Sequence, residues 1–123
     1  MNAIASPLTF PDKLLLGGAL VTGDGIAEPI LNPATGEAVC SVKEASIEQI
    51  EAAVHSASAA FPAWSRTTPA QRSALLLEIA TSIDQQADYL AGLEAVNCGK
   101  PAHLARQDDL AGTADVFRFF AGA

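Results

Sequence analysis

The spacing of hydrophobic residues along this chain changes near residue 46. Before that point, short apolar runs alternate with turn residues, which is typical of β-strands. The runs lie at 13–16, 19–22, 29–31 and 38–42. The Gly17-Gly18 pair between the first two runs predicts a β-hairpin. Residues 1–12 show no such pattern, and we expect a loose N-terminal arm there.

From residue 46 onward, apolar residues recur at helical spacing. Ser46 with Gln49, and Thr68 with Gln71, form two capping boxes, so each pair predicts a helix start. The first helix carries an apolar stripe made of Ile47, Ile50, Val54, Ala57 and Phe61. We expect Pro62 to end this helix, because proline disfavours helical geometry at the preceding residue.

Three further helical stretches follow. The second helix begins at Pro69, and the polar run at 84–86 is a candidate break after it. A third stretch leads to Asn97, where Gly99 is the predicted C-terminal cap. The last helix is predicted from about His103 to Phe120. The chain therefore combines strands at 13–42 with helices at 46–121.

The predicted helices carry more apolar surface than the few short strands can cover. Half of the residues are hydrophobic, and the sequence contains neither a βαβ unit nor an internal repeat. The uncovered positions are Ile47, Val54, Leu76, Ile83, Phe117, Phe119 and Phe120. We expect a further surface to cover them, either from a C-terminal remainder or from other subunits.

Charge and composition narrow the classes of partner. The net charge of −7 argues against binding to nucleic acid or to anionic membranes. No apolar run approaches the roughly 20 residues that span a bilayer. The N-terminus lacks the pattern of a signal peptide. Two cysteines are too few for a disulfide framework, so we expect a reducing, cytoplasmic setting.

Six short segments occur in a characteristic order. They are Leu15–Gly18, Asn32–Glu37, Ala52–Trp64, Pro69–Leu75, Leu93–Pro101 and Phe117–Gly122. In this order they resemble the N-terminal quarter of an NAD(P)-dependent aldehyde dehydrogenase. The resemblance implies an α/β fold, in which residues 13–123 form an incomplete N-terminal segment of the cofactor-binding domain. This segment itself would be mostly helical, with a short N-terminal hairpin and strands.

The segments 97–101 and 115–123 are most similar to those of γ-aminobutyraldehyde dehydrogenases, which are relatives of betaine aldehyde dehydrogenases. The resemblance implies NAD-dependent oxidation of an aminoaldehyde such as 4-aminobutanal, in polyamine breakdown. In this family a cysteine thiolate attacks the aldehyde, hydride passes to the nicotinamide, and a glutamate activates water. It also implies a homo-oligomer. A betaine aldehyde or broad-specificity aldehyde dehydrogenase is an open alternative.

The catalytic motifs of this family do not occur within residues 1–123. The resemblance therefore implies no catalytic residue and no NAD-binding residue in this segment. We expect the segment alone to be inactive, with the remainder of the enzyme or other subunits as its partners. The alternative is a non-catalytic helical module that self-associates or docks on another protein.

The resemblance gives two sets of residues a candidate role. The side chain of Asn97, with the backbone carbonyls of Ile30 and Leu31, would hold a monovalent cation. Many relatives carry aspartate at this position, and asparagine keeps the oxygen ligand but lacks the charge. Asp109 would face the substrate and attract its ammonium group. The alternative roles are a plain helix-terminal asparagine and an aspartate that stabilises a helix start.

The two cysteines and the two histidines are weaker candidates. Cys98 lies beside Lys100 in sequence, as reactive cysteines often lie near a cation, but the resemblance places it at a helix end without chemistry. We interpret Cys40 as a small packed hydrophobic residue. His55 and His103 lack partners at metal-ligand spacing.

Overall fold

Two antiparallel hairpins occupy the N-terminal third of the chain. The computed structural model describes residues 8–123. In the first hairpin, β1 (Leu14–Leu16) pairs with β2 (Ala19–Val21). Gly17 and Gly18 connect these strands with φ values of 59° and 84°. Two consecutive left-handed residues suit the twist of a tight hairpin, so the Gly-Gly prediction is confirmed.

The second hairpin pairs β3 (Ala27–Leu31) with β4 (Ala38–Lys43), and it forms a separate two-stranded sheet. Its turn is organised by Asn32, whose carbonyl accepts from the Gly36 N–H at 2.7 Å and whose side chain accepts from the Ala34 N–H at 2.9 Å. Both strands occur where apolar runs in the sequence predicted them. β3 begins two residues earlier than expected.

Helix α1 (Ile47–Trp64) begins with the predicted capping box. The Gln49 N–H donates to Ser46 Oγ at 3.2 Å, and the Ser46 N–H donates to Gln49 Oε1 at 3.0 Å. The prediction that Pro62 ends the helix is wrong, because α1 continues to Trp64. Near a helix end, proline removes one backbone donor, and the Ser65 N–H still closes the last turn on the Phe61 carbonyl at 2.8 Å.

Helices α2 (Pro69–Gln85) and α3 (Ala87–Cys98) meet at Gln86, so the predicted break in the polar run is confirmed. The capping box at the start of α2 is also present. After α3, Gly99 adopts a left-handed conformation with φ of 77°, and its N–H donates to the Ala95 carbonyl at 3.0 Å. This is the predicted glycine cap.

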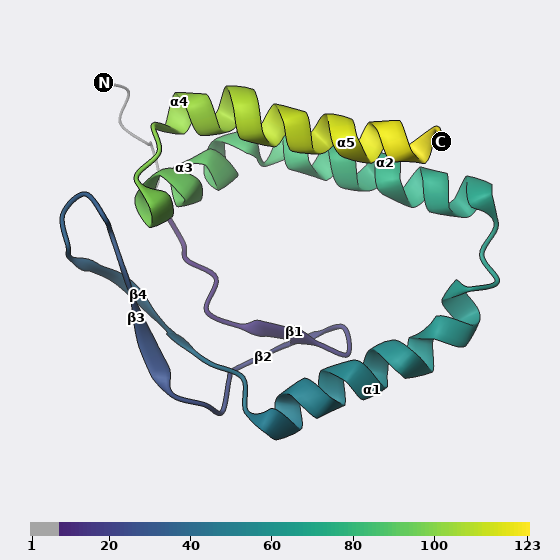
Figure 1. The fold of residues 1–123 in the computed structure, drawn as a ribbon, viewed down its shortest axis with the longest axis horizontal. Helices are drawn as coiled ribbons and strands as arrows, with labels where there is room; N and C mark the ends of the chain where they lie inside the picture. Colours follow the sequence, from purple (N-terminus) through teal and green to yellow (C-terminus); the bar gives the residue numbers. More distant parts are fainter. Residues whose placement is uncertain (1–7) are drawn as a thin grey trace. The chain divides into compact units, whose positions relative to one another are not determined.

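The last helical stretch is continuous, but it is not a uniform α-helix. It consists of α4 (Ala102–Leu104), the π-helix η1 (Ala105–Leu110) and α5 (Ala111–Ala121). Its extent agrees with the predicted last helix, whereas the π-helix was not predicted. Helix α5 packs along α2, as Figure 1 shows.

The elements group into two compact units. The strand unit contains residues 10–67, and the helical unit contains residues 8–9 and 68–123. The described part of the chain is thus mostly helical with two short strand pairs, as the sequence predicted. No helix within residues 8–123 is both long and apolar enough to cross a membrane.

The core of the helical unit is built from small side chains. Ala80 on α2, Ala91 on α3, Ala105 on η1 and Ala114 on α5 are each at most 2% exposed. Among residues 8–123, no large side chain is fully buried. Alanine contacts let helices approach closely, but they bury little apolar area, so this core contributes less free energy of folding than one built from leucine or phenylalanine.

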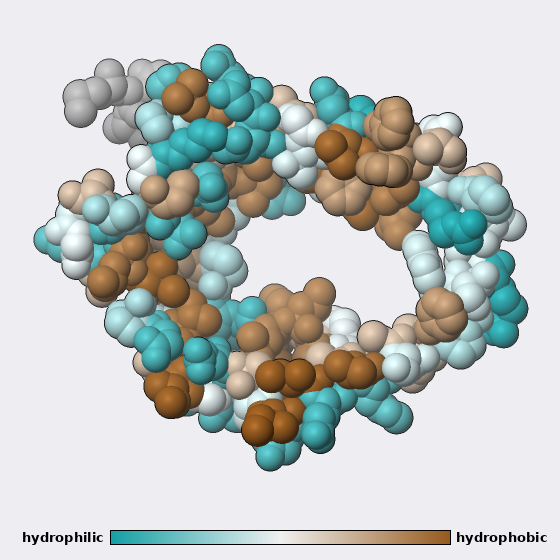
Figure 2. Space-filling model, viewed as in Figure 1, coloured by the Kyte–Doolittle hydropathy of each residue, from teal (hydrophilic) through white to brown (hydrophobic). Residues whose placement is uncertain are grey.

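Large apolar side chains are instead found at the surface of both units (Figure 2). Ile47 on α1 and Phe119 on α5 are each 71% exposed, and Phe120 is 62% exposed. Leu76, Ile83 and Phe117 are half-buried. The excess of apolar surface predicted from the sequence is therefore present on α1 and on the end of α5, and it is smaller on α2.

Candidate functional site

An ion pair joins the turn after α3 to the π-helix. Lys100 Nζ lies 2.5 Å from Asp109 Oδ2, and the two side chains are 33% and 45% exposed. The hydrogen bond that Lys100 donates to Asp109 raises the pKa of Lys100 above its ordinary value, with smaller contributions from the charges of Asp109, Asp108 and Cys98. The candidate substrate residue Asp109 therefore has a cation in direct contact.

The backbone on both sides of this ion pair is well anchored. Lys100 lies between the left-handed Gly99 and Pro101, whose ring fixes its own φ. Asp109 lies on η1, which packs against α3 and whose first residue, Ala105, is fully buried. The hydroxyl of Thr113 donates to the Asp109 carbonyl at 2.7 Å. The ion pair therefore connects two segments that are already held together by packing.

The neighbouring carboxylate is in a different situation. Asp108 is exposed, and within residues 8–123 its side chain makes neither a hydrogen bond nor an ion pair. It influences Lys100 only through its charge. Successive residues of a helix point in different directions, so Lys100 contacts one of these two carboxylates and not the other.

Cys98 is the last residue of α3, as expected, and it is exposed. Its Sγ lies 3.2 Å from Glu94 Oε1, one helical turn earlier. The structure thus gives this thiol an acidic partner on its own helix. Cys40 is a half-buried residue of β4.

The three residues of the predicted cation site lie on different elements. Ile30 and Leu31 belong to β3, where they pair with Cys40 and Ala38. Asn97 is the penultimate residue of α3, and its side chain is exposed. The first two residues belong to the strand unit and Asn97 to the helical unit, and the monovalent cation site stays a prediction.

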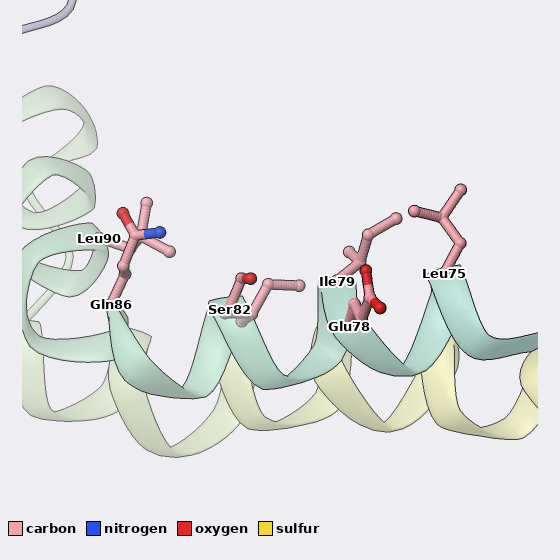
Figure 3. A pocket seen from close by; sticks show the side chains of 7 residues that line it. Leu75, Glu78, Ile79, Ser82, Gln86 and Leu90 are labelled. Carbon is pink, nitrogen blue, oxygen red and sulfur yellow. The ribbon is translucent and has the colours of Figure 1, made fainter.

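A shallow groove of about 350 Å³ runs along α2 to the start of α3 (Figure 3). Its lining is largely aliphatic, with single polar residues between, and consists of Leu75, Glu78, Ile79, Ser82, Ile83, Gln86 and Leu90. Neither cysteine nor histidine is among these residues. The groove therefore offers a largely aliphatic surface for packing, without a thiol or an imidazole in its lining.

Comparison with known proteins decides the family. Residues 21–123 match the profile of the aldehyde dehydrogenase family. The chain belongs to this family. The match contains Val21 of the first hairpin, the whole second hairpin and all the helices, so five of the six sequence segments that indicated this family lie within it.

Relatives of this aldehyde dehydrogenase segment include enzymes named for different aldehydes. The bovine 2-aminomuconic semialdehyde dehydrogenase is 42% identical over 92 residues, which are 75% of this chain and 19% of that protein. The betaine aldehyde dehydrogenase of Vibrio vulnificus is 40% identical over 108 residues, 87% of this chain and 22% of that protein. The chain thus spans about a fifth of the length of the curated relatives it matches.

Solved structures agree with this assignment. The NAD⁺ complex of an aldehyde dehydrogenase from Bacillus cereus is 36% identical, with a TM-score of 0.87 over 94% of this chain and 24% of that chain. A mutant of an aldehyde dehydrogenase from the same species gives a TM-score of 0.90 over 99% of this chain at 34% identity. The fold of the segment is therefore that of an aldehyde dehydrogenase.

Proposed function

We propose that this chain is the N-terminal segment of an NAD-dependent enzyme that oxidises an aminoaldehyde, such as 4-aminobutanal, to the acid. The observation that carries the proposal is the match of residues 21–123 to the aldehyde dehydrogenase family. NAD is supported by the similar Bacillus cereus enzyme, which was solved with NAD⁺. A nitrogen-bearing substrate is supported by the names of the bovine and Vibrio vulnificus relatives.

The segment has a supporting role in this proposal. NAD supplies a hydride acceptor when bound, and we assign neither an NAD contact nor a catalytic group to residues 8–123. Asp109 attracts the ammonium group of the substrate. The carbonyls of Ile30 and Leu31, with the Asn97 side chain, hold a monovalent cation. The complete enzyme is a cytoplasmic homo-oligomer, and the 123-residue segment alone does not turn over aldehyde.

Steady-state kinetics of the full-length enzyme that carries this segment test the proposal. NADH formation is measured with 4-aminobutanal, betaine aldehyde and butanal, and NADP replaces NAD in a parallel series. We expect the highest kcat/KM with 4-aminobutanal and NAD, and no turnover by the isolated segment. A clear preference for betaine aldehyde or butanal would assign the enzyme to one of the alternative substrate classes.

A variant separates the role of Asp109 from general effects of charge. Asp109→Asn should raise KM for 4-aminobutanal and leave KM for butanal unchanged, because only the first aldehyde carries an ammonium group. Asp115→Asn is the matched control, since Asp115 is bound to Arg118 at 2.9 Å on the same helical stretch. Equal effects of the two variants on 4-aminobutanal would contradict a specific role of Asp109.

One observation favours a second function, a non-catalytic docking or self-association module. The exposed Ile47 and Phe119 give the chain apolar surfaces of the kind found at protein interfaces. Intact-mass analysis of the purified protein and of any polypeptide that copurifies with it separates the two functions. A second, larger polypeptide with aldehyde dehydrogenase activity supports the enzyme; a stable self-assembled segment without such a polypeptide supports the module.

A further inference from the structure

We propose that Lys100 is a specificity-determining residue, which weakens the binding of cationic aldehydes by competing with their ammonium group for the Asp109 carboxylate. The inference rests on the proposed function, in which Asp109 attracts the substrate ammonium. It adds a residue whose effect is opposite to that of Asp109: Lys100 limits the selectivity that Asp109 provides.

The contact between the two residues carries the inference. Lys100 Nζ lies 2.5 Å from Asp109 Oδ2, which is the contact that a substrate ammonium would itself make with this carboxylate. A second cation that approaches Asp109 therefore meets a carboxylate whose charge is already balanced, and it also meets the positive charge of Lys100. The hydrogen bond to Asp109 raises the pKa of Lys100, so the contact favours the protonated amine.

The surrounding backbone favours the ion pair over an arrangement in which the side chains of Lys100 and Asp109 lie apart. The pair joins the capped end of α3 to η1, and Ala91 and Ala105 are buried in these two elements. Because the backbone segments are already fixed by this packing, ion pairing costs mainly the side-chain entropy of Lys100. The fold itself therefore places Lys100 where it competes with the substrate ammonium group for Asp109.

Three variants of the full-length enzyme test this role. Lys100→Met frees the Asp109 carboxylate, and Lys100→Arg keeps a cation beside it. Arg106→Met removes a different cation from η1, the π-helix that carries Asp109. Arg106 is paired with Asp88 at 2.6 Å, so its loss leaves the Lys100–Asp109 contact intact. Each variant is assayed with 4-aminobutanal and with the uncharged butanal.

We expect Lys100→Met to lower KM for 4-aminobutanal by about two- to fivefold, the range that corresponds to a partly exposed ion pair. KM for butanal, and kcat for both aldehydes, should stay unchanged. Lys100→Arg and Arg106→Met should resemble the unmodified enzyme. In the double variant with Asp109→Asn, the gain from Lys100→Met should disappear.

Two results would overturn the inference. The first is an unchanged or higher KM for 4-aminobutanal in Lys100→Met, and the second is an equal change for both aldehydes, which indicates a structural effect. Failure of the proposed function is recognised separately, because the unmodified enzyme would then show no preference for 4-aminobutanal over butanal. An enzyme that prefers 4-aminobutanal but is insensitive to Lys100→Met refutes only the role of Lys100.

Discussion

The Ser73 hydroxyl donates a 2.6 Å hydrogen bond to the Ala121 carbonyl, and so connects the start of α2 to the end of α5. The last carbonyls of a helix have no partner within the helix, and Ser73 supplies one for α5. Both residues are half-buried, which makes water a poorer replacement for this hydroxyl. The bond therefore fixes the lengthwise position of α5 on α2 at one end of their contact.

Replacing Ser73 with alanine should destabilise the helical unit. We expect Ser73→Ala to lower the free energy of unfolding by about 1 kcal/mol, the net value of a typical intramolecular hydrogen bond. Ser82→Ala on the same helix is the matched control, since within residues 8–123 the exposed Ser82 side chain makes no hydrogen bond. Urea unfolding followed by circular dichroism measures both variants, and equal midpoints would contradict a role for the Ser73 bond.

Gly23 should be intolerant of any side chain. A Cβ atom at this buried position would lie 2.2 Å from the Glu44 carbonyl oxygen and 2.3 Å from that of Lys43, so the backbone would have to move. Gly112 on α5 is the control, because a Cβ atom there meets nothing within 4 Å in the part of the chain that the structure describes.

We therefore expect Gly23→Ala to speed amide exchange in the segments 23–26 and 43–46, and Gly112→Ala to stabilise α5, since alanine is favoured over glycine by about 1 kcal/mol within a helix. Hydrogen–deuterium exchange with peptide-level mass spectrometry reports both. Unchanged protection around Gly23 in the first variant would show that the contact with residues 43 and 44 is relaxed in solution.

The start of α1 should weaken in acid. Hydrogen bonds from the Glu48 backbone and from Ser46 lower the pKa of the Glu48 carboxyl below the ordinary value of 4.5. A lowered folded-state pKa means that ionised Glu48 favours the folded helix; this contribution is complete above pH 4.5 and is lost as the pH falls through the lower folded pKa.

Glu48→Gln should remove this part of the pH dependence. Helical content of the chain is followed by circular dichroism between neutral pH and acid, for the variant and for a Glu51→Gln control on the same helix. Glu51 is beyond the first turn, where the favourable effect of a negative charge has largely decayed. Identical acid transitions in Glu48→Gln and in the unmodified chain would refute the assignment.

The aromatic end of α5 should drive self-association of the isolated segment. Phe119 and Phe120 are 71% and 62% exposed, and their rings make an edge-to-face contact with centroids 5.3 Å apart. We expect the 123-residue chain to form concentration-dependent oligomers in analytical ultracentrifugation, and the double variant Phe119→Ser, Phe120→Ser to shift them toward monomer. Equal sedimentation of the two proteins would place the association surface elsewhere, with the exposed Ile47 and Val54 on α1 as the next candidates.

Local sequence signals predicted most helix boundaries because the relevant interactions are themselves local. The capping boxes of Ser46 and Thr68 and the cap at Gly99 need only residues within one turn, and all three are present. Gln49 shows the limit of such reasoning. Besides its part in the capping box, its Nε2 donates to the Thr22 carbonyl at 2.9 Å, a contact across 27 positions that no local pattern reveals.

The candidate site was less predictable for the same reason. Asp109 was selected by resemblance, but its contact with Lys100 depends on the chain reversal at 99–101 and on the π-helix. The sequence of η1 has ordinary helical spacing, and Pro62 gave a stronger signal for an interruption than any residue of 105–110 did. Whether a helix tolerates a proline or widens into a π-helix depends on what packs against it, and this information is distributed over the chain.

The π-helix has a consequence for how substitutions and gaps in this region are compared between homologues. A π turn holds about one residue more than an α turn. Loss of a single residue between Ala105 and Leu110 would allow α4, η1 and α5 to form one uniform α-helix, while α5 remains packed on α2. Because the π turn accommodates its extra residue within one turn, the residues on both sides of the deletion would keep their faces, and only the side chains of η1 itself would change direction. A one-residue insertion or deletion during evolution could therefore change which acidic side chain meets Lys100, so equivalent columns in an alignment of this stretch need not be equivalent positions in space.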